Sequence, residues 1–224
     1  MGRLGVILGS SATGTRARLA AAAETEGAVV LQRHAGAGGY TLPHLIDHAA
    51  NVRALLEAGC DRALAICSVG SLREEIGIGS LLCPDDFIAL QVTVSALADS
   101  GAHRTPGFDP GWRAEVAAAG SAAGVGDGGV YWQASGPRFE TPAEIRLIAP
   151  HAHVVGMTLA SESIVAGELG LRHAAICAVD NLANGVGPGP LSVAAMEAAR
   201  EENAERLQTA LATMLPTLLA GEPA

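Results

Sequence analysis

Short apolar runs recur along the chain, and segments with a helical spacing of apolar residues separate several of them. Runs of this length, bounded by polar or glycine-containing stretches, predict buried strands. We expect strands at residues 4–8, 28–32, 63–67, 81–90, 130–133, 154–157 and 174–179. Strands that alternate with helices predict an α/β fold, in which helices cover both faces of a central sheet. No composition shift marks a boundary, so we expect one domain over residues 1–224.

The expected helices are marked by apolar spacing and by end signals. In segment 42–60 four apolar residues share one helical face, and Gly59 follows as a stop signal; the four are Leu45, Ala49, Val52 and Leu56. Segment 192–219 is typical of one long amphipathic helix, with Pro216 as the position where it would break. A shorter helix is expected to begin with Ser161 as its cap.

Residues 134–146, ASGPRFETPAEIR, combine a helix start with two residues that a helix start does not explain. The signature of a capped N-terminus is formed by Thr141, Pro142 and Glu144. Phe139 and Glu140 come just before it and place an aromatic ring beside a carboxylate. Because the chain has only three phenylalanines, this pair predicts a holder for a flat, polar ligand.

Several predicted strands end in small or basic polar residues. In an open α/β sheet, ligands bind beyond the carboxyl ends of the strands. Small residues there let backbone N–H groups approach an anion, and a guanidinium adds a fork of donors. The strand ends that predict such an anion site are Gly9-Ser10-Ser11, Arg33-His34, Ser68-Val69-Gly70-Ser71 and Thr158.

Composition excludes several classes of partner. The chain carries 14 Lys+Arg against 23 Asp+Glu and has no basic run, so we expect no nucleic-acid partner. The apolar runs are interrupted by charges, Gly or Pro, and the N-terminus does not resemble a signal peptide, so we expect no membrane partner. Four cysteines without a CxxC pair are read as free thiols of a cytoplasmic protein: Cys60, Cys67, Cys83 and Cys177. His44 and His48 lack a third ligand nearby, so no metal site is expected.

Six stretches together make the chain resemble the trimeric nucleoside phosphorylases. They are GVILGSS, RHAGAGGYTLPHLIDHAANVRALLEAGC, SVGSLREEIGIGSLLCPDDFI, SGPRFETPAEIR, VVGMTLASESIVAGELGL and AVDNLANG, and they cover most of residues 4–185 in the family's order. The resemblance is to the branch of purine nucleoside phosphorylases and methylthioadenosine or methylthioinosine phosphorylases. It implies a central mixed sheet flanked by helices, and a homotrimer.

The resemblance also implies a reaction and a role for each motif. The reaction is reversible phosphorolysis of a purine nucleoside, with inorganic phosphate as co-substrate and with no cofactor or metal. The implied phosphate-binding residues are Ser10, Arg33, His34 and Thr158. Ser68 would line both phosphate and sugar, and Met157 would lie against the ribose. Phe139 would stack on the purine, and Glu140 would accept a hydrogen bond from the base edge.

The second base-reading residue lies in AVDNLANG. Neighbouring strand residues point to opposite faces, so Asp180 and Asn181 cannot both face the purine. We favour Asn181, whose amide can donate to N7 and contact O6; a shift of one residue would select Asp180 instead. Adenosine-type members carry Asp at this position, so Asn181 with Glu140 predicts a 6-oxopurine.

The chain departs from the family at several positions. The stretch between Ser11 and Arg33 is short, and Ser161 stands where Pro is usual. Ordinary purine nucleoside phosphorylases bind the 5′-hydroxyl of the substrate with a histidine that has no clear match in this chain. Val193 and Met196 fall near that position, which favours a substrate with an apolar 5′ group such as methylthio. In the loop that lends a residue to the neighbouring subunit's pocket, we assign that role to His103, with Phe108 as the alternative.

Three alternatives to a 6-oxopurine nucleoside phosphorylase stay open from the sequence. The nearest is a phosphorylase of 5′-methylthioadenosine or of another 5′-deoxy-5′-substituted adenosine. A nucleoside hydrolase on the same scaffold would not depend on phosphate. A non-catalytic relative would bind a base without turning over any nucleoside.

Overall fold

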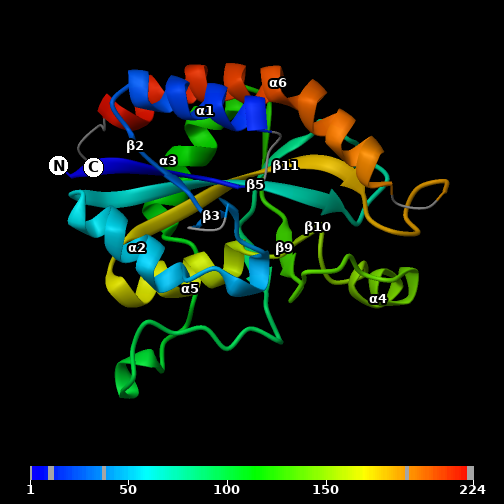
Figure 1. Cartoon of the computed structure of the whole chain (residues 1–224), viewed down its shortest axis with the longest axis horizontal. Coiled ribbons are helices and arrows are strands. Elements are labelled where there is room, and N and C mark those ends of the chain that lie inside the picture. Colours follow the sequence, from blue (N-terminus) through cyan, green and yellow to red (C-terminus); the bar gives the residue numbers. More distant parts are fainter. Residues whose placement is uncertain (1, 10–12, 37–38, 190–191, 221–224) are drawn as a thin grey trace.

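The long strand β5 organises a mixed sheet of nine strands (Figure 1). The computed structural model describes residues 2–9, 13–36, 39–189 and 192–220. Within these residues the sheet has the order β7-β9-β10-β5-β11-β6-β8, and β1 also pairs with β5 and carries β2 on its other side. The strands are β1 Arg3–Leu8, β2 Val29–Gln32, β5 Cys60–Ser71, β6 Leu81–Cys83, β7 Asp86–Ile88, β8 Val125–Asp127, β9 Val130–Gln133, β10 Val154–Gly156 and β11 Arg172–Leu182; β3 Ala35–Gly36 and β4 Gly39–Tyr40 form a separate hairpin.

Helices cover both faces of this sheet, which confirms the predicted α/β architecture. Helices α1, α3 and α6 lie on one face, and α2 and α5 lie on the other (Figure 1). Side chains along β1 alternate between the two faces of the sheet. Leu4, Val6 and Leu8 pack on the face covered by α1, α3 and α6, and Ile7 packs on the face covered by α2 and α5. The helices are α1 Thr13–Thr25, α2 His48–Glu57, α3 Pro110–Ser121, α4 Pro142–Ile148, α5 Leu159–Leu169 and α6 Val193–Ala220, with short 3₁₀ turns η1 Pro43–Leu45 and η2 Ser100–Ala102.

One edge of β5 changes partner along its length. Its first half pairs in parallel with β1 as far as Ile66, and its last residues pair antiparallel with β10 from Gly70 onward. The other edge pairs in parallel with β11 along most of the strand. Between Ile66 and Gly70 the sheet therefore splits, and a gap of this kind beyond the carboxyl end of a parallel strand is where α/β proteins bind ligands.

Several details of the predicted elements are wrong. The run 81–90 forms two strands on either side of Pro84, because proline offers no N–H to a ladder. Helix α2 begins only at His48, where the Asp47 carboxylate caps it, so Leu45 precedes the helix and is exposed. Leu55, not Leu56, is buried on its inner face.

The remaining end signals give a mixed result. Helix α5 starts at Leu159, so Ser161 lies inside it and exchanges hydrogen bonds with Gln133 instead of capping it. The capping box of Thr141 and Glu144 is present, as predicted. Helix α6 continues through Pro216. The four cysteines are buried and unbridged, and none of the described helices is both long and apolar enough to cross a bilayer.

Candidate functional site

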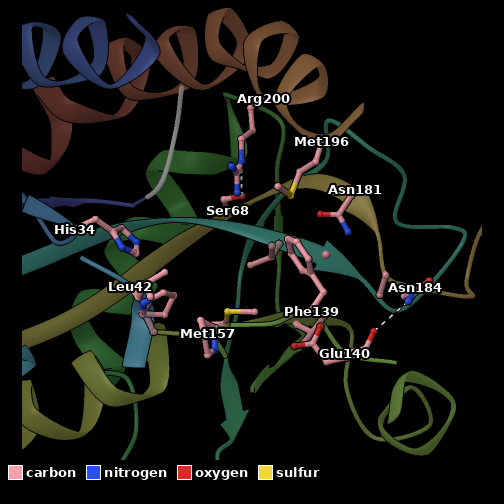
Figure 2. A pocket seen from close by; sticks show the side chains of 18 of the residues that line it. His34, Leu42, Ser68, Phe139, Glu140, Met157, Asn181, Asn184, Met196 and Arg200 are labelled. Atoms are coloured by element: carbon pink, nitrogen blue, oxygen red, sulfur yellow. Dashed lines mark hydrogen bonds between the residues drawn. The ribbon is translucent and has the colours of Figure 1, made fainter. Parts of the chain in front are cut away.

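A cavity of about 200 Å³ opens where the sheet splits (Figure 2). Its floor comes from the carboxyl ends of β5, β10 and β11, and its rim comes from the loop before α4 and from the start of α6. Nine of the twelve site residues predicted from the sequence line it: Arg33, His34, Ser68, Phe139, Glu140, Met157, Thr158, Asn181 and Met196. Segments far apart in the sequence therefore meet at one site.

Arg33 forms one end of this cavity. Its side chain is buried, and its guanidinium donates to Thr158 Oγ1 at 3.2 Å and to Glu162 Oε2 at 2.9 Å, while its Nε lies 2.7 Å from Glu162 Oε1. Gly9 makes this placement possible, because a Cβ at that position would lie 2.9 Å from Arg33 Nη1. The result is a fixed fork of donors beside a threonine hydroxyl, which suits an anion with several oxygens.

Glu162 is a buried acid that the sequence analysis did not identify. His48 and His173 lie 3.9 Å from its carboxylate oxygens. Burial raises the pKa of Glu162, and the neighbouring Arg33 charge acts in the opposite direction and favours the carboxylate. Burial, with the Arg33 charge in support, lowers the pKa of His48 to about 4 and that of His173 to about 3, so both imidazoles are neutral at pH 7. Arg33 contacts both carboxylate oxygens of Glu162, at 2.7 and 2.9 Å, and this two-point contact makes Arg33 and Glu162 the ion pair of the cluster.

His34 follows Arg33 and faces the same end of the cavity. Its Nδ1 lies 2.8 Å from the Thr41 carbonyl oxygen, and its ring stacks on Tyr40 at 4.7 Å between centroids. Because a carbonyl oxygen only accepts, Nδ1 must carry the proton in this contact. The hairpin β3–β4 thus sets the tautomer and the direction of the ring.

The opposite end of the cavity carries Phe139 and Glu140, which the capped start of α4 holds in place (Figure 2). Phe139 is 39% exposed, with its ring on the cavity wall. Glu140 is anchored through its backbone carbonyl, which accepts from Asn184 Nδ2 at 3.2 Å. Its Oε1 is buried without a hydrogen-bond partner among the described residues, and burial raises the pKa of this carboxyl. A buried acceptor without a partner indicates a place for a ligand donor.

A bulge in β11 decides which of two neighbouring polar residues faces the cavity. The pairing with β5 shifts between Val179 and Asn181, and Asp180 is the extra residue. Asn181 lines the cavity, where its amide donates to the Leu182 carbonyl at 2.9 Å. Asp180 turns toward α6 and accepts from Asn203 at 2.9 Å. Asn181 therefore faces the cavity, as in the alignment that the sequence analysis favours.

Three predicted site residues are not among the described residues that line this cavity. Ser10 lies outside the described residues, and so does the side chain of Val193. His103 directly follows η2, is exposed, and does not belong to the lining of its own chain's cavity. Phe108, the alternative to His103, is buried against Phe87 within its own chain.

The structure adds residues that the sequence analysis missed. Asn184 and Leu42 line the cavity, and Arg200 reaches it from α6. Arg200 lies on the same helix face as the buried residues Met196 and Leu207, at spacings of four and seven residues. A charged residue within this apolar stripe is the sequence signal that could have identified Arg200 as a site residue. No sequence pattern identifies Leu42 as a site residue, because the position of its turn depends on the preceding hairpin β3–β4.

Comparisons with known proteins identify the family of this chain. The sequence model of the Phosphorylase superfamily matches residues 10–216. The chain belongs to this superfamily. A probable 6-oxopurine nucleoside phosphorylase of Archaeoglobus fulgidus is 46% identical over 70% of this chain, and a probable S-methyl-5′-thioinosine phosphorylase of Methanothermobacter thermautotrophicus is 39% identical over 67%.

These matches span 65% and 55% of the two relatives' own lengths, which is less than two thirds of each. A solved structure, methylthioadenosine phosphorylase from Schistosoma mansoni in complex with adenine, superposes with a TM-score of 0.82 at 19% identity, and the match covers 99% of this chain and 93% of that one. At this identity the likeness establishes the fold, in agreement with the predicted nucleoside phosphorylase-like architecture.

Proposed function

We propose that this protein is a pentosyltransferase that catalyses the reversible phosphorolysis of a purine nucleoside. The products are the free base and ribose 1-phosphate, or its 5-modified form. The observation that carries this proposal is a single cavity with two chemically different ends. Arg33, His34 and Thr158 form an end suited to an anion, and Phe139 with Glu140 forms an end suited to a flat base.

The reaction breaks the bond between the sugar C1′ and the purine N9, and C1′ then bonds to a phosphate oxygen. The bonding electrons move onto the purine as the sugar becomes oxocarbenium-like, and the purine gains the proton that the hydrogen phosphate loses when its oxygen bonds to C1′. Asn181 would donate to N7, where negative charge collects, and Glu140 would accept from N1–H. Arg33 and Thr158 would hold phosphate below C1′, and Met157 would lie against the ribose. Inorganic phosphate is the co-substrate, and these steps require no cofactor or metal.

The substrate we favour is a 6-oxopurine nucleoside in its 5′-methylthio form. Glu140 and Asn181 match N1–H and O6/N7 of such a base. Met196, which is buried and lines the cavity, supports an apolar 5′ group. The second candidate is a phosphorylase of 5′-methylthioadenosine, favoured by the name of the solved structure with this fold. The four buried thiols support a cytoplasmic location.

A nucleoside panel with and without phosphate tests this function. We expect base release only with phosphate, and we expect 5′-methylthioinosine to be used more efficiently than inosine, because an unpaired hydroxyl beside Met196 costs about 1–3 kcal/mol. Base release in phosphate-free buffer would identify a hydrolase. Base binding without any turnover would identify a non-catalytic relative, and faster turnover of the adenosine analogue would select the second candidate.

We further propose that the protein works as a homotrimer in which His103 reaches a neighbouring subunit's cavity. Apolar side chains at the cavity mouth are exposed in the single chain, including Tyr40 at 55% and Leu42 at 42%. A second copy of the chain would cover them.

The mass in solution tests this assembly. Sedimentation equilibrium at micromolar concentration is expected to give three times the 22.6 kDa of the chain. Leu42→Glu should lower this mass, because it places a charge in the covered surface, whereas Ile78→Glu changes an exposed apolar residue outside the cavity lining and should not. A wild-type mass near that of one chain would refute the assembly.

A further inference from the structure

Arg200 lines the same cavity as Arg33 but reaches it from α6, whereas Arg33 follows β2 and pairs with Glu162 of α5. It extends from α6 to Ser68 at the carboxyl end of β5, on the His34 side of the cavity and away from Glu140 (Figure 2). Its Nε and Nη2 lie 3.2 and 3.1 Å from Ser68 Oγ. Arg200 also lines the smaller cavity behind Ser68, which reaches Gly9. A second guanidinium thus lies next to the strand end that is expected to hold phosphate.

The contacts of the two guanidinium groups differ in strength. Arg33 is held by Glu162 at 2.7 and 2.9 Å, within the range of charge-assisted hydrogen bonds. Arg200 Nε reaches the Asp180 carboxylate at 3.3 Å, which is longer than that range. Asp180 has other donors as well, because Asn203 Nδ2 and Ser68 Oγ both bond to it. Asp180 therefore keeps two hydrogen-bond donors if Arg200 turns toward a stronger acceptor.

The charge balance at this end of the cavity gives a reason for such a turn. Glu162 neutralises the positive charge of Arg33. The pair therefore gives a phosphate ion correctly placed hydrogen-bond donors but little net positive charge. Inorganic phosphate carries between one and two negative charges at pH 7. A second guanidinium at the same end supplies the missing attraction, and its planar fork can engage two phosphate oxygens.

We propose that Arg200 is a second guanidinium ligand of the phosphate co-substrate, in contact with it beside Ser68. This inference rests on the proposed function, because it assumes that the phosphate lies between Arg33 and Ser68. It differs from a purely structural role, in which Arg200 would only tie α6 to β11 through Asp180. The two roles predict different dependences on phosphate concentration.

The experiment compares Arg200→Gln and Arg200→Met with Arg206→Met and with wild type. Arg206 lies on the same helix and donates to the Gly79 carbonyl at 2.7 Å, outside the cavity lining, so it is the matched control. Two quantities are measured: the rise in melting temperature of nucleoside-free protein with inorganic phosphate, and the KM values for phosphate and nucleoside. Arg200→Gln keeps donors toward Ser68 and Asp180, so it preserves the fold if Arg200→Met does not.

We expect both Arg200 variants to weaken phosphate binding about tenfold or more, since they remove a charged donor from the anion. The KM for the nucleoside should change much less, and Arg206→Met should bind phosphate like wild type. Unchanged phosphate binding in Arg200→Gln, or an equal rise in both KM values, would overturn the inference. If phosphate stabilises wild type but not the Arg200 variants, and no nucleoside is cleaved, the inference stands while the proposed reaction fails. If phosphate does not stabilise wild type, both fail.

Discussion

Arg33→Ala is expected to raise the phosphate concentration needed for half-maximal activity from about thirtyfold to several thousandfold. Removing one partner of a buried, hydrogen-bonded charge pair costs about 2–5 kcal/mol, and each 1.4 kcal/mol is a factor of about ten. The KM for the nucleoside should change far less, because Arg33 and the base-binding residues occupy opposite ends of the cavity.

The same substitution leaves Glu162 buried without its charged partner, so a loss of stability could imitate a loss of binding. Arg33→Ala combined with Glu162→Gln removes both charges and separates the two effects. We expect the double variant to recover much of the melting temperature that Arg33→Ala loses, but none of the phosphate affinity. Glu162→Gln alone serves as the control. If phosphate saturation is unchanged in both Arg33 variants, Arg33 has a structural role and the anion end of the cavity is misassigned.

The sequence predicted the parts of this molecule that depend on local rules. The start of α4 depends on Thr141 and Glu144, three residues apart, and both hydrogen bonds of the capping box formed. The polar ends of β2 and β5 also met as expected, because these strands run parallel and bring their carboxyl ends to one edge of the sheet. Thr158 reaches the same cavity by another route, since it follows β10, which pairs antiparallel with β5. Within α2, however, the apolar spacing was read one turn too early, since Leu45 matches the period but precedes the Asp47 cap.

Contacts between distant segments could not be predicted in the same way. Glu162 lies 129 residues from Arg33 in the sequence, and nothing local to either residue reveals their pairing. Arg200 lies 132 residues from Ser68, on a helix whose charged residues were taken as its solvent-exposed face. Both residues shape the charge at the anion end of the cavity. The location of that end was therefore predictable from the sequence, but the charges around it were not.

Asn181→Asp is expected to move specificity from 6-oxopurine toward 6-aminopurine nucleosides by about tenfold or more, because each mispaired polar group costs about 1–3 kcal/mol. The amide of Asn181 can donate to N7 or to O6, whereas a carboxylate offers only acceptors. A carboxylate therefore repels O6 and accepts from an exocyclic amino group. Protonated, it could also donate to N7 as charge collects there. The measurement is the ratio of kcat/KM for matched inosine and adenosine analogues.

Asp180→Asn is the matched control for this prediction, since it changes the neighbouring residue in the opposite sense. Asp180 turns toward α6 and bonds to Asn203, so its substitution should affect stability and the Arg200 contact and leave the base preference unchanged. Glu140 remains in the Asn181 variant and still prefers an N1–H, so the ratio should shift without reversing fully. If the ratio instead moves with Asp180→Asn and stays constant with Asn181→Asp, then the bulge in β11 presents Asp180 to the base. The 6-oxopurine assignment would fail with it, because a carboxylate beside the purine favours the amino group.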